Sequence, residues 1–230
     1  MVLGLTGRYC AGKDAAARIL ERKGFRVIDV DRVGHEVLEE RAEEVAAAFG
    51  PGVRRADGSI DRRVLGRIVF ADPAALARHE AIVHPAMVER VRALAAAERA
   101  AGRDAAVNAA LLHHMGLDLL CDAVLEVRAC FPRRFLRGLR RDRLGPIQVL
   151  RRMRSQRTGL RRLNRKTPGV DTYTVRNDRA TTRRLEHSVD RIVDRLRHRQ
   201  AQGMEQQKIF WVILSVTAFV VVVRVVGLCL

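Results

Sequence analysis

The sequence predicts an α/β fold, in which helices cover a parallel β-sheet. Apolar strand candidates alternate with helical segments up to about residue 199, and this alternation favours parallel strands joined by right-handed crossovers. A glycine-rich loop stands between the first strand and the first helix. The residues are 48% hydrophobic but only 4% aromatic, which favours an Ala/Leu/Val-rich parallel sheet over a β-sandwich.

The strand candidates are short apolar runs that end at turn-forming or polar residues. They are expected at 2–6, 25–30, 105–112, 123–127 and 172–175. Ligands bind beyond the carboxyl ends of the strands in sheets of this kind. Residues 6–13, Asp31 and 111–114 all fall at or just after such ends. We therefore expect one ligand site at that edge of the sheet.

The helices are expected where Ala-rich segments lie between turn signals. Their ranges are 14–23, 33–49, 64–70, 73–101, two helices after Pro132 that are split by Gly145-Pro146, and 180–199. Asp72-Pro73 is a typical helix start, because Asp caps the first turn and Pro fits its first position. Pro85 predicts a kink in the longest of these helices.

The positive charge of the chain is strongly localised. The formal net charge is +17, and all but four of the 43 basic residues are arginine, a bias that we attribute partly to a GC-rich coding sequence. Between Arg128 and Arg165, fourteen arginines accompany one acid, Asp142. Such a block repels itself unless it is solvated or faces an anion. We favour solvated charge for most of these arginines, and an RNA-binding protein that uses the block is a distant alternative.

The loop after the first strand has the G-x-x-x-x-G-K spacing of a phosphate-binding loop. Backbone N–H groups of such a loop surround a β-phosphate, its lysine reaches the β- and γ-phosphates, and the helix start adds a partial positive charge. The predicted nucleotide-binding residues here are Gly7, Arg8, Tyr9, Cys10, Ala11, Gly12, Lys13, Asp14 and Ala15. Asp14 stands where Ser or Thr is usual, and we expect its carboxylate to hold Mg²⁺ directly or through water.

Two further segments resemble dephospho-coenzyme A kinases. The first is Val27-Ile28-Asp29-Val30-Asp31 with 34–38 after it, and the second is DGSIDRRVLGRIVF at 57–70 with LARHEAIVHP at 76–85. The resemblance covers about residues 1–199, and 57–85 is its most specific part. It implies a three-layer fold like that of the P-loop nucleoside kinases, with an acceptor-binding helical region at about 32–101 and a lid at about 137–167.

The resemblance also implies a reaction: transfer of the γ-phosphate of ATP to the 3′-hydroxyl of dephospho-coenzyme A, the last step of coenzyme A biosynthesis. It makes Asp31 the candidate base, although capping of the following helix is an alternative role. Asp29 is expected either to have a structural role or to contact a ligand of the metal ion without binding the ion itself. Lys13 and Arg137 complete the predicted catalytic set.

The resemblance assigns the remaining site residues to two groups. Those expected at the nucleotide are Arg141, which shares a helix face with Arg137 at spacing i, i+4, and Asn177. Those expected at the acceptor, beside Asp31, are Arg62, Arg63 and His84. For His84 the favoured alternative is a packing role beside Pro85.

One family motif differs in this chain. Where the family has Pro-Leu-Leu-x-Glu after the third strand, this chain has ALLHH at 110–114, so His114 replaces a carboxylate. This change and Asp14 motivate a second hypothesis, a nucleotide-binding relative that has lost catalysis. His113 and His114 are not expected to share a metal ion, because neighbours at a strand end point in opposite directions.

The composition changes after Arg199. A glutamine-containing linker is expected at 200–208, and the apolar segment 209–230 is long enough to span a bilayer with Arg224 inside it. A membrane anchor and a tail from a fused reading frame are both open interpretations. The cysteines lack metal or redox spacing and no secretory signal is evident, so we expect a kinase in the reducing cytoplasm. Its expected partners are ATP and dephospho-coenzyme A, without nucleic acid, and the membrane only through such an anchor.

Overall fold

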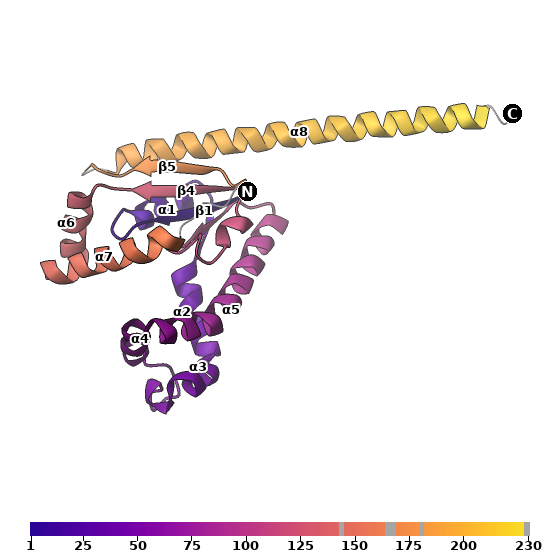
Figure 1. Ribbon diagram of the computed structural model, residues 1–230. Coiled ribbons are helices and arrows are strands. Elements are labelled where there is room, and N and C mark those ends of the chain that lie inside the picture. Colours follow the sequence, from indigo (N-terminus) through magenta and orange to yellow (C-terminus); the bar gives the residue numbers. More distant parts are fainter. Residues whose placement is uncertain (143–144, 164–168, 180–181, 228–230) are drawn as a thin grey trace. The chain divides into compact units, whose positions relative to one another are not determined.

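The computed structural model describes the backbone of residues 1–142, 145–163, 169–179 and 182–227, and the side chains of 155–163, 209 and 211–227 lie outside this description. The chain divides into two units, Met1–Glu186 and His187–Leu230. Five strands form the sheet of the first unit in the described part of the chain, in the order β2-β3-β1-β4-β5 (Figure 1). The strands are β1 Val2–Gly7, β2 Arg26–Asp29, β3 Ala105–Asn108, β4 Ala123–Arg128 and β5 Thr172–Arg176.

All neighbouring strands of this sheet run parallel, which confirms the predicted α/β class. Leu5 of the central strand β1 is aligned with Asn108 of β3 and with Leu125 of β4. Every residue of β3 is buried, and so are five of the six residues of β1. Helices cover a parallel sheet on both faces, and this explains why these strands are continuous apolar runs instead of alternating ones.

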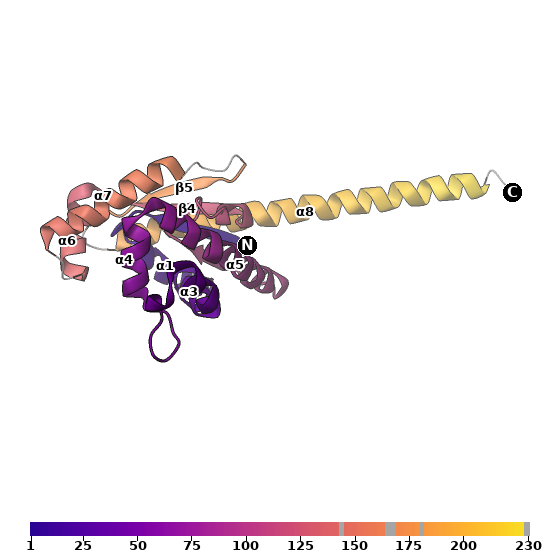
Figure 2. The same cartoon turned by 60° about the horizontal axis from the view of Figure 1, so that its bottom comes forward.

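The described α-helices that precede β5 fall into three groups. The first group is α1 alone, Lys13–Arg22, after the glycine-rich loop. The second consists of α2 Val30–Glu40, α3 Ala42–Phe49, α4 Arg62–Ala71 and α5 Pro73–Ala100, with the 3₁₀ turn η1 Pro51–Val53. The third consists of α6 Phe131–Asp142 and α7 Pro146–Leu163. Helices α2 to α5 gather into one helical region. Helix α6 lies beyond the carboxyl end of β4, and α7 packs next to α6 (Figures 1 and 2).

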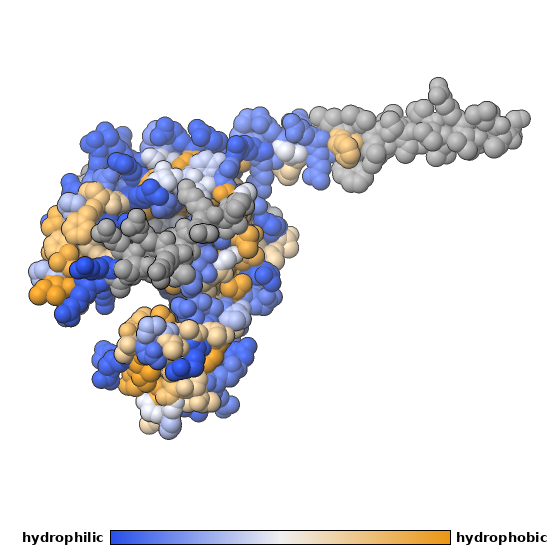
Figure 3. Space-filling view, in the orientation of Figure 1, coloured by the Kyte–Doolittle hydropathy of each residue, from blue (hydrophilic) through white to orange (hydrophobic). Residues whose placement is uncertain are grey.

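One hydrophobic cluster of the described residues joins this helical region to the sheet. Val37 of α2, Val91 of α5 and Val107 of β3 are each at most 1% exposed and belong to the same cluster. Because the core is shared, α5 is fixed relative to the edge of the sheet. Helices α3 and α4 form one end of the helical region, and the surface of the first unit is indented beside this end (Figure 3).

Aspartate side chains begin three helices of this region. Asp29 caps α2, Asp61 caps α4 and Asp72 caps α5, each by accepting hydrogen bonds from backbone N–H groups of the first turn. Such caps satisfy donors that have no partner inside the helix. The predicted start at Asp72-Pro73 is therefore confirmed, and so is the division of the Arg-rich segment into two helices at Gly145-Pro146.

The last helix, expected to end at 199, continues to Gly227, and two further expected ranges are wrong. The helix expected at 33–49 is interrupted at Arg41 (φ −98°, ψ 18°), and the break lets both Val37 of α2 and Val45 of α3 enter the core. The strand expected at 105–112 ends at Asn108, and residues 110–116 form turns. These turns bury Leu112 completely, so the apolar run reflects burial of a turn and not an extension of the strand.

Helix α8, Arg183–Gly227, begins at the end of the first unit and continues through the second, so residues 200–208 are helical. Within the described residues, no helix combines the length and the apolar character that crossing a membrane requires. The side chains of the expected transmembrane segment, 209–230, lie outside the described residues except for Phe210.

Candidate active site

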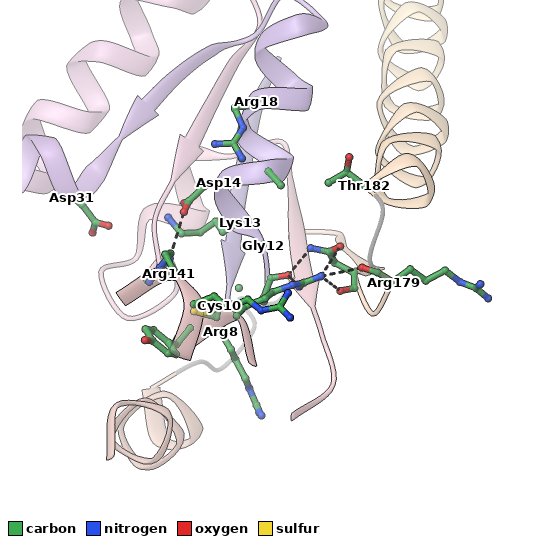
Figure 4. Close-up of a pocket in the computed structure, with 18 residues that line it drawn as sticks. Arg8, Cys10, Gly12, Lys13, Asp14, Arg18, Asp31, Arg141, Arg179 and Thr182 are labelled. Atoms are coloured by element: carbon green, nitrogen blue, oxygen red, sulfur yellow. Dashed lines mark hydrogen bonds and ion pairs between the residues drawn. The ribbon is translucent and has the colours of Figure 1, made fainter. Parts of the chain in front are cut away.

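A pocket of about 590 Å³ lies at the carboxyl ends of the strands, where the sequence places the site (Figure 4). Thirteen of the predicted site residues line it: Gly7, Arg8, Tyr9, Cys10, Ala11, Gly12, Lys13, Asp14, Ala15, Asp31, Arg137, Arg141 and Asn177. The structure also brings Arg18, Arg140 and Arg179 to the pocket, and each adds positive charge. A pocket that is lined by a glycine-rich loop at a helix start and by several arginines suits an anionic ligand.

Lys13 is held by a residue that the sequence analysis did not identify. Its ammonium donates a hydrogen bond of 2.6 Å to Oδ1 of Asn108, the last residue of β3. Asn108 is only 6% exposed. An amide at the end of an otherwise apolar buried strand is the signal that could have revealed it. Asn108 orients the Lys13 side chain in the pocket.

Gly12 is the residue at which the loop enters α1, and its backbone is left-handed (φ 104°). A Cβ at this position would lie 2.0 Å from Nδ2 of Asn177. That Nδ2 donates a 2.9 Å hydrogen bond to the Ala11 carbonyl. Glycine is therefore required here both by the dihedral angle and by the close approach of the β5–α8 connection.

Replacing Gly12 with alanine is expected to lower the free energy of unfolding by about 2–3 kcal/mol, as the sum of backbone strain and displacement of Asn177. Gly24→Ala is the matched control, because Gly24 also has a positive φ (88°) but a Cβ added there would meet no atom within 4 Å. It is expected to cost about 1 kcal/mol. Urea unfolding of both variants measures the difference, and equal losses would contradict the role of Asn177.

Two arginines of α6 hold the phosphate loop in place. Arg137 donates to the carbonyls of Ala11 (3.3 Å), Asn177 (2.9 Å) and Arg179 (3.2 Å). Arg134 is 6% exposed and donates from Nε to the Tyr9 carbonyl at 2.8 Å. The expectation of solvated charge is therefore wrong for Arg134, whose side chain is buried because loop carbonyls need donors. Burial lowers the pKa of the Arg134 guanidinium.

A second group of contacts links α6 to the loop and to α1. The Tyr9 hydroxyl donates to Asp142, and the Arg141 guanidinium lies 5.3 Å from the Tyr9 ring centroid. Burial, followed by the hydrogen bond to Asp142, raises the pKa of Tyr9 to about 12. Hydrogen bonds from Arg141 and Tyr9 lower the pKa of Asp142. Arg141 also pairs with Asp14 at 3.7 Å (Figure 4), so Tyr9 remains a neutral donor beside a charged pair.

Asp29 and Asp31 have separate positions. The Asp29 carboxylate accepts from the Asp31 N–H at 3.0 Å and caps α2, which bears out a structural role for Asp29. Asp31 lies in the first turn of α2, so the alternative in which Asp31 is the cap is wrong. Its exposed carboxylate reaches the pocket that Lys13 and Asp14 line, on the side toward which the Lys13 side chain extends (Figure 4).

The other predicted acceptor residues do not line this pocket. Arg62 and Arg63 are exposed in the first turn of α4. His84 is half-buried on α5, with its ring 5.6 Å from that of His114 in an edge-on arrangement. Burial lowers the pKa of His84, while Glu80 acts in the opposite direction.

The two adjacent histidines point to different partners, as expected. His113 contacts Asp118 (Nδ1–Oδ2 2.6 Å), and both side chains are at most 5% exposed. His114 instead faces Glu80 and His84. His114 does not line the pocket, so its replacement of the family's carboxylate leaves the described pocket wall unchanged.

Comparisons with known proteins agree on one family. The family model described as dephospho-CoA kinase matches residues 1–180. Dephospho-CoA kinase from Moorella thermoacetica is 39% identical over 176 residues, which are 74% of this chain and 83% of that protein. The enzyme of the same name from Streptomyces avermitilis is 37% identical over 90% of this chain and 98% of its own length.

Solved structures show the same architecture. A crystal structure of a protein from Thermus thermophilus is 27% identical, with a TM-score of 0.67, and the similarity covers 86% of this chain and 97% of that one. Neither the RNA-binding alternative nor the loss of catalysis is favoured by these findings. The chain belongs to the dephospho-CoA kinase family.

Proposed function

We propose that this chain transfers the γ-phosphate of ATP to the 3′-hydroxyl of dephospho-coenzyme A and so completes coenzyme A biosynthesis. The observation that carries the proposal is that the phosphate loop and the Asp31 carboxylate line one pocket. A phosphoryl donor and a base for an acceptor hydroxyl are thus brought to the same space. Phosphoryl transfer depends chiefly on such positioning and on charge stabilisation.

Five side chains of the pocket have a proposed part in this reaction. The loop N–H groups and Lys13 bind the β- and γ-phosphates. Lys13 also neutralises the negative charge on the phosphoryl group during its transfer. Asp31 orients the 3′-hydroxyl and accepts its proton. Arg137 supports the loop through its carbonyls and Arg141 adds charge at its rim, while Asn177 fixes the loop from the side of β5. Arg62, Arg63 and His84 stay predicted acceptor contacts.

The proposed division of the chain assigns these parts to regions. Residues 1–199 form the kinase domain, with the acceptor-binding region at about 32–101 and the lid at about 137–167. Residues 200–208 link it to the apolar segment 209–230. We place the reaction in the cytoplasm, where both small-molecule substrates are available and the cysteines of the described residues, Cys10, Cys121 and Cys130, stay reduced.

Mg²⁺ is the proposed metal, and the residues present fit it. Asp14 offers an exposed carboxylate (60%) in the first turn of α1, next to the loop. Mg²⁺ prefers oxygen ligands, keeps several waters and takes one or two carboxylates together with substrate phosphates. When bound, it supplies charge neutralisation at the phosphates.

Replacing Asp14 with alanine is expected to raise the Mg²⁺ concentration for half-maximal activity by about tenfold, because alanine has no oxygen ligand, whereas serine would supply the hydroxyl that is usual at this position. Glu21→Ala is the matched control, because it removes one exposed carboxylate from α1 outside the pocket. Magnesium titrations of turnover at saturating ATP compare the two variants. The same magnesium dependence in Asp14→Ala and the parent chain would contradict the metal role.

A coupled ADP-release assay on the full chain tests the proposed function. Dephospho-coenzyme A is expected to elicit ADP release, and coenzyme A is the matched control because its 3′-hydroxyl is already phosphorylated. Nucleotide binding without turnover would contradict the proposal in favour of an impaired relative. Salt-sensitive RNA binding without nucleotide binding would contradict it in favour of the basic block as the functional surface.

A further inference from the structure

Outside the pocket, three side chains with metal-binding atoms converge where α5 meets the turn after β3. Glu80 and His84 lie one helical turn apart on α5, and His114 lies in the turn. One ligand atom from each residue lies within 4.8 Å of the other two. None of the three lines the nucleotide pocket. We propose that Glu80, His84 and His114 form a binding site for a divalent transition-metal ion, of which Zn²⁺ is the best fit.

The chemistry of the three groups favours zinc over Mg²⁺. Two imidazoles and one carboxylate form a known ligand set for Zn²⁺ with three protein ligands, whereas Mg²⁺ prefers oxygen alone. Ligand atoms about 2.1 Å from a tetrahedral ion are about 3.4 Å apart. Glu80 Oε2 and His114 Nε2 are 3.6 Å apart. Small side-chain rotations bring the set to binding distance, and the fourth position is left for water or an anionic oxygen.

The state of His114 supports a ligand role. Its Nε2 atom is buried and makes no hydrogen bond with the described residues. A buried ring nitrogen without such a partner is costly, and metal coordination would satisfy it. The side chains of Glu80 and His114 are 29% and 19% exposed. An ion can therefore enter from solvent, and the protein can supply part of its coordination shell.

The surroundings hold both halves of the cluster in place. The core that joins α5 to the sheet includes Val83, next to His84, and Leu112, two residues before His114. His113 is anchored to the fully buried Asp118. The i, i+4 spacing puts Glu80 and His84 on one face of α5. A bound ion would therefore cross-link α5 to the turn that follows β3.

Zinc binding to the full chain, after removal of metal with a chelator, tests the proposal. Competition against a chromophoric zinc indicator is expected to show that each chain binds one Zn²⁺ ion tightly. His114→Gln and Glu80→Gln are expected to weaken it by more than the roughly tenfold to hundredfold that loss of a supporting group costs. His35→Gln removes an exposed imidazole from α2 and is expected to bind like the parent chain. Equal affinities of all four proteins, or no stoichiometric binding, would overturn the site.

Two further readouts separate loss of the site from loss of the fold. Zn²⁺ is expected to raise the Tm of the parent chain and of His35→Gln but not of His114→Gln, because only a protein that binds the ion in its folded state is stabilised. Glu80→Gln serves if His114→Gln does not fold. Co²⁺ is expected to give tetrahedral visible bands without a thiolate charge-transfer band. A thiolate band would place the metal on cysteine and overturn the assignment.

Discussion

Replacing Lys13 with methionine is expected to lower kcat by about 10²–10³-fold, the typical cost of removing a charge-stabilising donor from a transition state. Lys13 begins α1, lines the pocket and is oriented by Asn108 through a 2.6 Å hydrogen bond. Methionine keeps most of the side-chain volume but removes the ammonium. Steady-state kinetics with ATP and dephospho-coenzyme A measure the loss.

Lys23→Met is the control for this change. Lys23 is the C-cap residue of the same helix and lies outside the pocket, so the same loss of charge is expected to change kcat by less than about twofold. If Lys13→Met retained more than a tenth of the parent kcat, Lys13 would not stabilise the transferring phosphoryl group. A fall of similar size in Lys23→Met would show that overall charge, and not the pocket, is responsible.

The second large effect is expected at Asp31. Asp31→Asn removes the proposed base and is expected to reduce kcat by about 10²–10⁴-fold, while thermal stability stays within a degree or two of the parent chain. Stability is preserved because the cap of α2 is the neighbouring Asp29, which accepts from the Asp31 N–H. Turnover and a thermal melt of the same preparation measure both quantities.

Asp29→Ala is the complementary variant. Loss of the cap is expected to lower the free energy of unfolding by about 1 kcal/mol, with a much smaller effect on kcat than that of Asp31→Asn. The reverse pattern, in which Asp29→Ala abolishes turnover and Asp31→Asn only destabilises the protein, would exchange the two roles and contradict the account.

The sequence was sufficient for the fold class and for most of the pocket, because both depend on local patterns. Apolar strands that alternate with helices predict a parallel sheet, and the spacing of Gly7, Gly12 and Lys13 predicts a phosphate-binding loop, which the structure places at the pocket. The strand order β2-β3-β1-β4-β5 was not predicted, since strand neighbours are set by long-range packing. The division of roles between Asp29 and Asp31 was left open, because a shift of two residues in the helix start decides which carboxylate caps the helix and which reaches the pocket.

The features that the sequence did not predict are contacts between segments that are distant in the chain. Arg134 is indistinguishable in the sequence from its solvated neighbours, and only the docking of α6 on the loop reveals that its side chain is buried at the Tyr9 carbonyl. His114 similarly meets His84 only because a turn, and not a strand, follows Asn108. Apolar periodicity cannot distinguish a buried turn from the end of a buried strand. In addition, acidic and basic residues that meet at one site can come from distant parts of the chain.

The most direct test of the proposed activity follows the phosphoryl group itself. The full chain is incubated with dephospho-coenzyme A and with ATP that carries ¹⁸O in its γ-phosphate, and the products are separated and analysed by tandem mass spectrometry. The account predicts coenzyme A that carries the label in its 3′-phosphate. Label found only in inorganic phosphate, or at any other position of the acceptor, would contradict it.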